Sequence, residues 1–142
     1  MVIGIIGENC SGKSTLAEAL AASIGAEIIT GKDYLRMAKS ESMAKLLFKK
    51  RLAAALEGEN LIYVITENEH LELLPEGAVR VLVKAELADI KERFRERMHG
   101  VLPPPVEQML ERRHGAFDNT PHEYEFNSSK DSLSEFIDTF TV

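Results

Sequence analysis

Residues 7–14 read GENCSGKS and contain the residue types with which a backbone turn binds phosphate. Gly7 and Gly12 are separated by four residues, and Lys13 and Ser14 follow directly. Glycines let the backbone amides turn inward, a lysine ammonium neutralises phosphate charge, and a serine hydroxyl is a ligand for Mg²⁺. The spacing therefore predicts a loop that binds the phosphates of a nucleotide. The expected binding residues are Gly7, Asn9, Cys10, Ser11, Gly12, Lys13, Ser14 and Thr15, and Lys13 is also expected to be catalytic.

The segments on both sides of this loop are those that a phosphate loop requires. Residues 2–6 form a β-branched apolar run, typical of a strand buried on both faces. From Lys13 the apolar spacing is helical, and Gly25 suits the position just after a helix. A helix N-terminus adds partial positive charge at the phosphates. A glycine turn that merely joins a strand to a helix would not need the lysine. Cys10 is expected to be a small filler rather than a reactive thiol.

Strand-like and helix-like segments alternate along the rest of the chain. Further strands are expected at 26–30, 61–65, 78–83 and 124–127, and further helices at 33–57, 87–98, 106–114 and from Ser132 onward. The core stripe of the 33–57 helix is expected to hold Met37, Met43, Leu46 and Leu47. This alternation predicts an α/β fold, a three-layer sandwich in which helices cover both faces of a five-stranded parallel sheet.

Composition and charge narrow the class of protein. The chain has 142 residues, so one domain over 1–142 is expected. A net charge of −6 argues against sequence-independent nucleic-acid binding, and no nucleic-acid partner is expected. No apolar run approaches the length of a membrane span, and no basic segment precedes the first one, so neither an anchor nor a signal peptide is expected. The single cysteine excludes an internal disulfide and suits a reducing, cytoplasmic compartment.

Three stretches resemble the small P-loop kinases, the family that includes nucleoside monophosphate kinases and shikimate-type kinases. They are GIIGENCSGKSTLAEALA at 4–21, GAEIITGKDYLRMA at 25–38 and VRVLVKAELADIKERFRERM at 79–98. The first stretch is specific for phosphate binding, and the other two are suggestive. The resemblance implies a P-loop fold with strand order 2-3-1-4-5. It also implies ATP as the donor, Mg²⁺ as the cofactor and a small molecule as the acceptor.

The resemblance implies an acceptor site beyond the second strand. Thr30, Gly31, Asp33 and Arg36 would lie there, across the sheet edge from the donor phosphates. Arg36 could grip an acceptor anion in a forked geometry, and Asp33 could orient or deprotonate an acceptor hydroxyl. The alternative is that Asp33 is a first-turn acid favoured by the helix dipole and Arg36 a solvated surface residue.

A mobile lid is implied at about 95–118, with arginines that close over the transferring phosphoryl group. Arg93 and Arg97 share a helix face because they are four residues apart. Beyond the prolines, Arg112 and Arg113 are the candidates for a second cation, with Arg113 favoured. The charged helix could instead be a salt-bridged surface.

Glu67 follows the third expected strand, where the family places an acid, usually Asp, near the hydration shell of Mg²⁺. The Asp-Gly and Pro-Arg pairs typical of nucleoside monophosphate kinases are missing here. Glu67 could therefore bind Mg²⁺ together with Ser14, bind the acceptor or act as a base toward it, or be only a loop acid. In the last loop, residues 127–129 lie where the resembling kinases contact the donor base.

The favoured function is transfer of the γ-phosphoryl group of Mg-ATP to a nucleotide, nucleoside or small hydroxy compound. The alternative is a nucleotide-binding switch protein without a small-molecule acceptor, although the guanine-selecting N/T-K-x-D motif is missing. A third interpretation is an inactive kinase-like scaffold. ATP and GTP both remain open as donors, and the oligomeric state cannot be inferred from the sequence.

Overall fold

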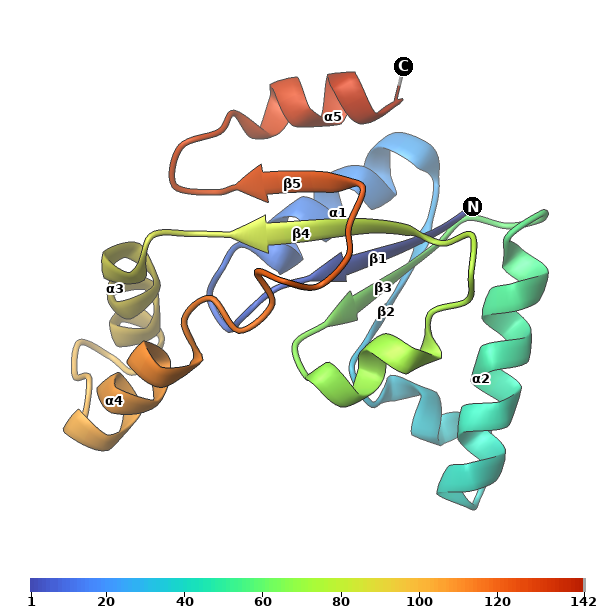
Figure 1. Cartoon of the computed structure of the whole chain (residues 1–142), viewed down its shortest axis with the longest axis horizontal. Helices are drawn as coiled ribbons and strands as arrows, with labels where there is room; N and C mark the ends of the chain where they lie inside the picture. The colour runs from blue at the N-terminus through green and yellow to red at the C-terminus, as the bar shows by residue number, and fades with distance from the viewer. Residues whose placement is uncertain (142) are drawn as a thin grey trace.

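The computed structural model describes residues 1–141, and within them five parallel strands form one sheet (Figure 1). The strands are β1 (Val2–Ile6), β2 (Glu27–Thr30), β3 (Leu61–Ile65), β4 (Val79–Lys84) and β5 (Tyr124–Asn127). Their order across the sheet is β2-β3-β1-β4-β5. β1 lies between β3 and β4, with Ile3 opposite Ile62 on one side and Val79 on the other. The expected fold class and strand order are confirmed.

Helices cover both faces of the sheet and its carboxyl end (Figure 1). They are α1 (Lys13–Ile24), α2 (Glu41–Ala55), α3 (Leu87–Arg97), α4 (Pro104–Arg113) and α5 (Leu133–Thr141), with two 3₁₀ helices, η1 (Asp33–Met37) and η2 (Asn68–Leu73). α1 and α5 cover one face, and α2 covers the other. α3 and α4 lie beyond the end of β4. Within the described residues, every helix is too short or too polar to cross a membrane.

The side chains of β1 alternate between two cores. Ile3 and Ile5 pack with Leu16 of α1. Val2 and Ile6 pack on the opposite face with Phe48 of α2. Because both faces are covered, the strand has no polar alternation, which is how the sequence showed it as buried.

A third apolar cluster attaches α3 and α4 to the loop after β1. Its buried members are Cys10, Ala85, Ile90 and Leu110. Cys10 is 6% exposed and fills space between the loop and the two helices, as expected from the sequence. The position of both helices relative to the glycine loop therefore depends on apolar packing.

The helix expected at 33–57 is wrong in its extent, because the chain is interrupted there. η1 ends at Met37, and Ala38 is extended, with φ −159° and ψ 164°. Ser40 then starts α2 by accepting a hydrogen bond from the backbone N–H of Met43 at 3.2 Å. The break lets Tyr34 of η1 stack on Phe48, with ring centroids 5.4 Å apart.

The expected core stripe of this segment is also wrong. Met37, Met43 and Leu46 are 37%, 48% and 48% exposed, and Leu47 is half-buried. The buried residues of α2 are Ala44, Phe48, Leu52 and Ala55. Both sets have helical spacing, so periodicity alone did not decide which one faces the sheet.

Smaller differences occur at two places. η2 follows β3 and was not expected. α4 begins at Pro104, earlier than the expected 106, with prolines in its first turn. A proline is tolerated there because its missing N–H would have no helical partner.

The Ser40 cap can be tested against its neighbour. Ser40→Ala should lower the free energy of unfolding by about 1 kcal/mol, because the N–H of Met43 loses its acceptor. Ser42→Ala, an exposed position inside α2, is the matched control and should be neutral or slightly stabilising. Urea denaturation of both variants measures the difference. Equal losses would show that the cap does not stabilise α2.

Candidate functional site

Glycines shape the loop between β1 and α1. A Cβ at Gly7 would lie 2.6 Å from Ser11 Oγ and 2.7 Å from the backbone oxygen of Val83. Gly12 has φ +105°, and a Cβ there would lie 2.8 Å from Cβ of Ser128. Both positions therefore exclude a side chain on steric grounds, and Gly12 also on conformational grounds.

Lys13 is the first residue of α1 and is 7% exposed. Its Nζ donates a hydrogen bond to the backbone oxygen of Glu8 at 2.9 Å. Burial lowers the pKa of Lys13 from 10.5 to about 8; Arg97 also lowers it, while Cys10 and Glu8 act in the opposite direction. An ammonium held in this way favours an anion that comes close to it.

A cavity of about 160 Å³ opens between this loop and the carboxyl ends of β2 and β3. We call it the loop cavity, and its lining includes Asn9, Cys10, Gly12, Lys13, Ser14, Thr15, Thr30, Thr66 and Arg97. Six of the expected phosphate-binding residues thus meet in one place. Thr30 and Arg97, expected at the acceptor site and in the lid, line the same cavity.

A larger cleft of about 590 Å³ continues from the loop toward α5. It is lined by Thr15, Arg93, Arg97, Phe126 and Asp131, among others. Arg97 lines both this cleft and the loop cavity. A ligand that spans the two spaces would pass beside its guanidinium.

Arg93 holds the loop in place. Its Nη1 donates to the backbone oxygen of Cys10 at 2.9 Å and to Ser128 Oγ at 3.0 Å. Cys10 has φ 62°, the left-handed region that non-glycine residues seldom adopt. Arg93 therefore contacts the strained residue of the loop directly.

Ser128, in the turn after β5, completes this network. Its hydroxyl donates to the backbone oxygen of Ser11 at 2.5 Å, and its N–H donates to the oxygen of Lys84 at 2.8 Å. The resemblance implied that residues 127–129 contact the donor base. In the structure Ser128 packs on Gly12, so this turn supports the phosphate loop.

A second cavity, of about 190 Å³, lies between the loop and α4. We call it the Glu67 cavity; it is lined by Glu8, Asn9, Thr66, Glu67, Asn68, Ile90, Leu110, Arg113, Ala116 and Phe117. Oε1 of Glu67 lies 3.6 Å from Nη1 of Arg113. Two residues expected in different roles, an acid after β3 and a lid arginine, thus form an ion pair.

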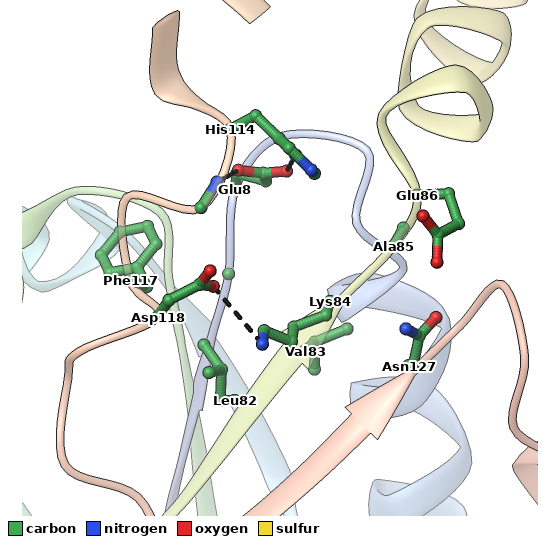
Figure 2. A pocket seen from close by; sticks show the side chains of 12 residues that line it. Glu8, Leu82, Val83, Lys84, Ala85, Glu86, His114, Phe117, Asp118 and Asn127 are labelled. Carbon is green, nitrogen blue, oxygen red and sulfur yellow. Dashed lines mark hydrogen bonds and ion pairs between the residues drawn. The ribbon is translucent and has the colours of Figure 1, made fainter. Parts of the chain in front are cut away.

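Glu8 connects the loop to the chain that follows α4. His114 donates through Nδ1 to one carboxylate oxygen at 2.6 Å, and the N–H of Gly115 donates to the other at 2.9 Å. Figure 2 shows Glu8 facing His114, and both line one pocket with the ion pair of Lys84 and Asp118. Residues 114–115 are therefore tied to the phosphate loop.

The structure does not bring Asp33 and Arg36 to the loop cavity. Oδ2 of Asp33 accepts a hydrogen bond from the N–H of Thr30 at 3.2 Å, which closes the turn after β2. Asp33 and Arg36 are exposed and border a separate hollow beside Arg51. Asp33 therefore has a structural role in this turn that does not depend on binding an acceptor molecule.

Glu8 and Thr66 lie at the site but were not predicted from the sequence. Glu8 occupies a variable position of the loop motif, so its type carries no signal. Thr66 follows β3 directly, and the carboxyl ends of neighbouring parallel strands meet at one edge of the sheet. Its position after a buried strand beside β1 was the available signal.

The hydroxyl groups in the loop cavity suit Mg²⁺. Ser14, Thr30 and Thr66 offer oxygen ligands, and Mg²⁺ takes oxygen ligands while keeping several waters. Within residues 1–141, no group of three or more His, Cys, Asp or Glu side chains could hold a metal. Glu67 lines the neighbouring cavity instead. The residues present thus fit a magnesium ion held mainly by phosphates, with Ser14 as a ligand.

No protein-family model and no curated protein sequence matches the chain. Solved structures match its fold. A shikimate kinase from Bacteroides thetaiotaomicron aligns over 99% of this chain and 96% of its own, with TM-score 0.60 and 18% identity. A gluconokinase from Sinorhizobium meliloti 1021 aligns over 96% of this chain and 87% of its own, with TM-score 0.61 and 17% identity. YorR from Bacillus subtilis, solved with phosphorylated GDP, aligns over 99% of this chain and 94% of its own, with TM-score 0.66 and 20% identity. The chain has the fold of the small P-loop kinases.

The contact between Gly12 and Ser128 gives a test of the loop. Gly12→Ala should lower the free energy of unfolding by about 2 to 4 kcal/mol, because it adds backbone strain and a clash. Gly25→Ala is the control: Gly25 has φ +69° and open space around its Cβ, so about 1 kcal/mol is expected. Ser128→Gly alone loses its own hydrogen bonds, so the clash is measured by a double-mutant cycle: Gly12→Ala should cost less in the Ser128→Gly background than in the wild type. Identical losses at Gly12 and Gly25 would contradict the contact.

Proposed function

We propose that this chain is an ATP-dependent phosphotransferase that acts on a small molecule. The observation that carries the proposal is the convergence of Lys13, Ser14 and Arg97 on one cavity at the N-terminus of α1. The phosphates of the donor bind in the loop cavity, where the loop amides and the helix N-terminus surround them. The rest of the nucleotide extends into the adjoining cleft past Arg97.

Charge neutralisation and positioning supply the catalysis. In phosphoryl transfer, negative charge spreads over the oxygens of the transferring group, and fixed cations stabilise it. Lys13 reaches this group from α1 and Arg97 from α3. Arg93 holds the loop through Cys10 and Ser128, so it acts on positioning rather than on the phosphoryl group itself.

Magnesium belongs to this proposal as the cofactor. It would neutralise charge on the donor phosphates, with the Ser14 hydroxyl among its ligands. Thr30 and Thr66 line the same cavity and would hydrogen-bond to the waters of the ion. Glu67, in the neighbouring cavity and paired with Arg113, is assigned to the acceptor side.

A switch protein is the second candidate, and one observation favours it. Glu8 of the phosphate loop holds His114 and Gly115, so that nucleotide occupancy would be communicated to the chain after α4. A kinase forms ADP when an acceptor is supplied, whereas a switch hydrolyses or retains nucleotide without one. Measuring ADP with and without acceptor separates the two.

Lys13→Ala tests the donor site. Loss of the ammonium should reduce acceptor-dependent ADP formation by roughly 10²- to 10³-fold, the usual cost of removing one group that stabilises the transition state. Lys49→Ala, an exposed lysine on α2, is the control and should keep wild-type activity. An unchanged rate in Lys13→Ala would refute the assignment of the donor site.

The lowered pKa of Lys13 predicts how nucleotide affinity changes with pH. Lys13 has a pKa of about 8 in the free protein, and a phosphate beside it raises that value. ADP affinity should therefore be constant at neutral pH and fall by up to about tenfold per pH unit above about pH 8. Calorimetry from neutral pH to about pH 9 should also show proton uptake. In a Lys13→Met variant, ADP affinity should no longer fall as the pH rises. An equal fall in that variant would show that Lys13 does not cause it.

A further inference from the structure

The Glu67 cavity lies where an acceptor for the proposed transfer would have to bind. It shares Asn9 and Thr66 with the loop cavity, so a molecule in one space lies beside a phosphoryl group in the other. Leu110 of α4 and Phe117 close the far side. Whatever binds there is held between the phosphate loop and the segment after α4.

The charges around this cavity are unfavourable for an anion. Two carboxylates, from Glu8 and Glu67, stand against one guanidinium, from Arg113. That guanidinium already faces Glu67 at 3.6 Å. An acceptor phosphate or carboxylate in this cavity would face an excess of negative charge. It would also have to compete with Glu67 for the guanidinium of Arg113.

The remaining features of the wall suit hydroxyl groups on a small apolar frame. Carboxylate oxygens accept hydrogen bonds from hydroxyls, and Glu67 is half exposed with accepting capacity left. Ile90, Leu110 and Phe117 line the same cavity and supply its apolar part. A volume of about 190 Å³ is below the range of drug-sized ligand sites.

We propose that the acceptor is a small uncharged hydroxyl compound, of about the size of a pentose, and that the Glu67 cavity selects it over its anionic counterparts. This inference rests on the proposed phosphotransferase function and adds the class of substrate to it. Glu67 accepts the hydrogen bond of the reacting hydroxyl. Arg113 is held by Glu67 and is not the anchor of an acceptor anion.

The transfer step follows from this placement. The acceptor hydroxyl oxygen forms a bond to the γ-phosphorus of ATP while the bond from that phosphorus to the β–γ bridging oxygen breaks. ADP leaves with the electron pair of the broken bond. The hydroxyl proton passes to the Glu67 carboxylate and from there to water, since this side chain is half exposed.

A matched pair of ligands tests the class of acceptor. Isotope-labelled protein saturated with Mg-ADP is titrated with D-ribose and, separately, with D-ribose 5-phosphate, and the amide signals of Thr66, Glu67 and Phe117 are followed by NMR. ADP fills the phosphate loop, so a sugar phosphate cannot bind there. Ribose should shift these signals with an affinity about tenfold or more above that of ribose 5-phosphate.

Glu67→Gln supplies the variant arm. Removing the negative charge of Glu67 frees Arg113, so the affinity ratio of ribose to ribose 5-phosphate should decrease or reverse. ADP affinity should stay within about twofold of that of the wild type. Glu72→Gln, an exposed acid on η2, is the control and should keep the wild-type preference.

Three results would overturn the inference: tighter binding of ribose 5-phosphate to the wild type, no shift with either sugar, or an unchanged preference in Glu67→Gln. Each of them leaves the phosphotransferase proposal standing as long as Mg-ADP binds. Failure of Mg-ADP to bind would overturn both.

Discussion

The structure depends on one buried positive charge. Lys13 keeps its ammonium among the backbone atoms of the phosphate loop, and the lowering of its pKa from 10.5 to about 8 corresponds to about 3 kcal/mol of lost stabilisation of the charged form. The oxygen of Glu8 compensates in part. A phosphate at the same place would supply the missing counter-charge. Burial of the Lys13 ammonium therefore destabilises the free protein and favours binding of a phosphate.

Three segments that are distant in sequence keep the loop around this charge. α3 contributes Arg93, the turn after β5 contributes Ser128, and the chain after α4 contributes His114 and Gly115. Each holds a different residue of the loop: Cys10, Ser11 or Glu8. The loop conformation is thus determined by tertiary contacts as much as by its own glycines, which explains how Cys10 is held at a positive φ.

The fold and the position of the glycine loop were largely predictable from the sequence, for a physical reason. A strand buried on both faces and a glycine-rich turn both have local signatures, so β1, the loop and α1 were found at their observed bounds. The buried face of α2 was not, because two sets of apolar residues share one period and burial of Tyr34 against Phe48 decides between them. The Glu67 ion pair depends on the packing of α4, which no local pattern reveals.

The central place of β1 affects how the protein is made. β1 leaves the ribosome before the other four strands, and its two neighbours in the sheet end only at Ile65 and Lys84. The glycine loop therefore emerges long before either flanking strand exists, and Ser128 follows later still. Contacts between such distant segments form late and slowly. A nascent chain stalled before β5 would contain the complete GENCSGKS motif but would lack the contact with Ser128 that holds the loop in its conformation.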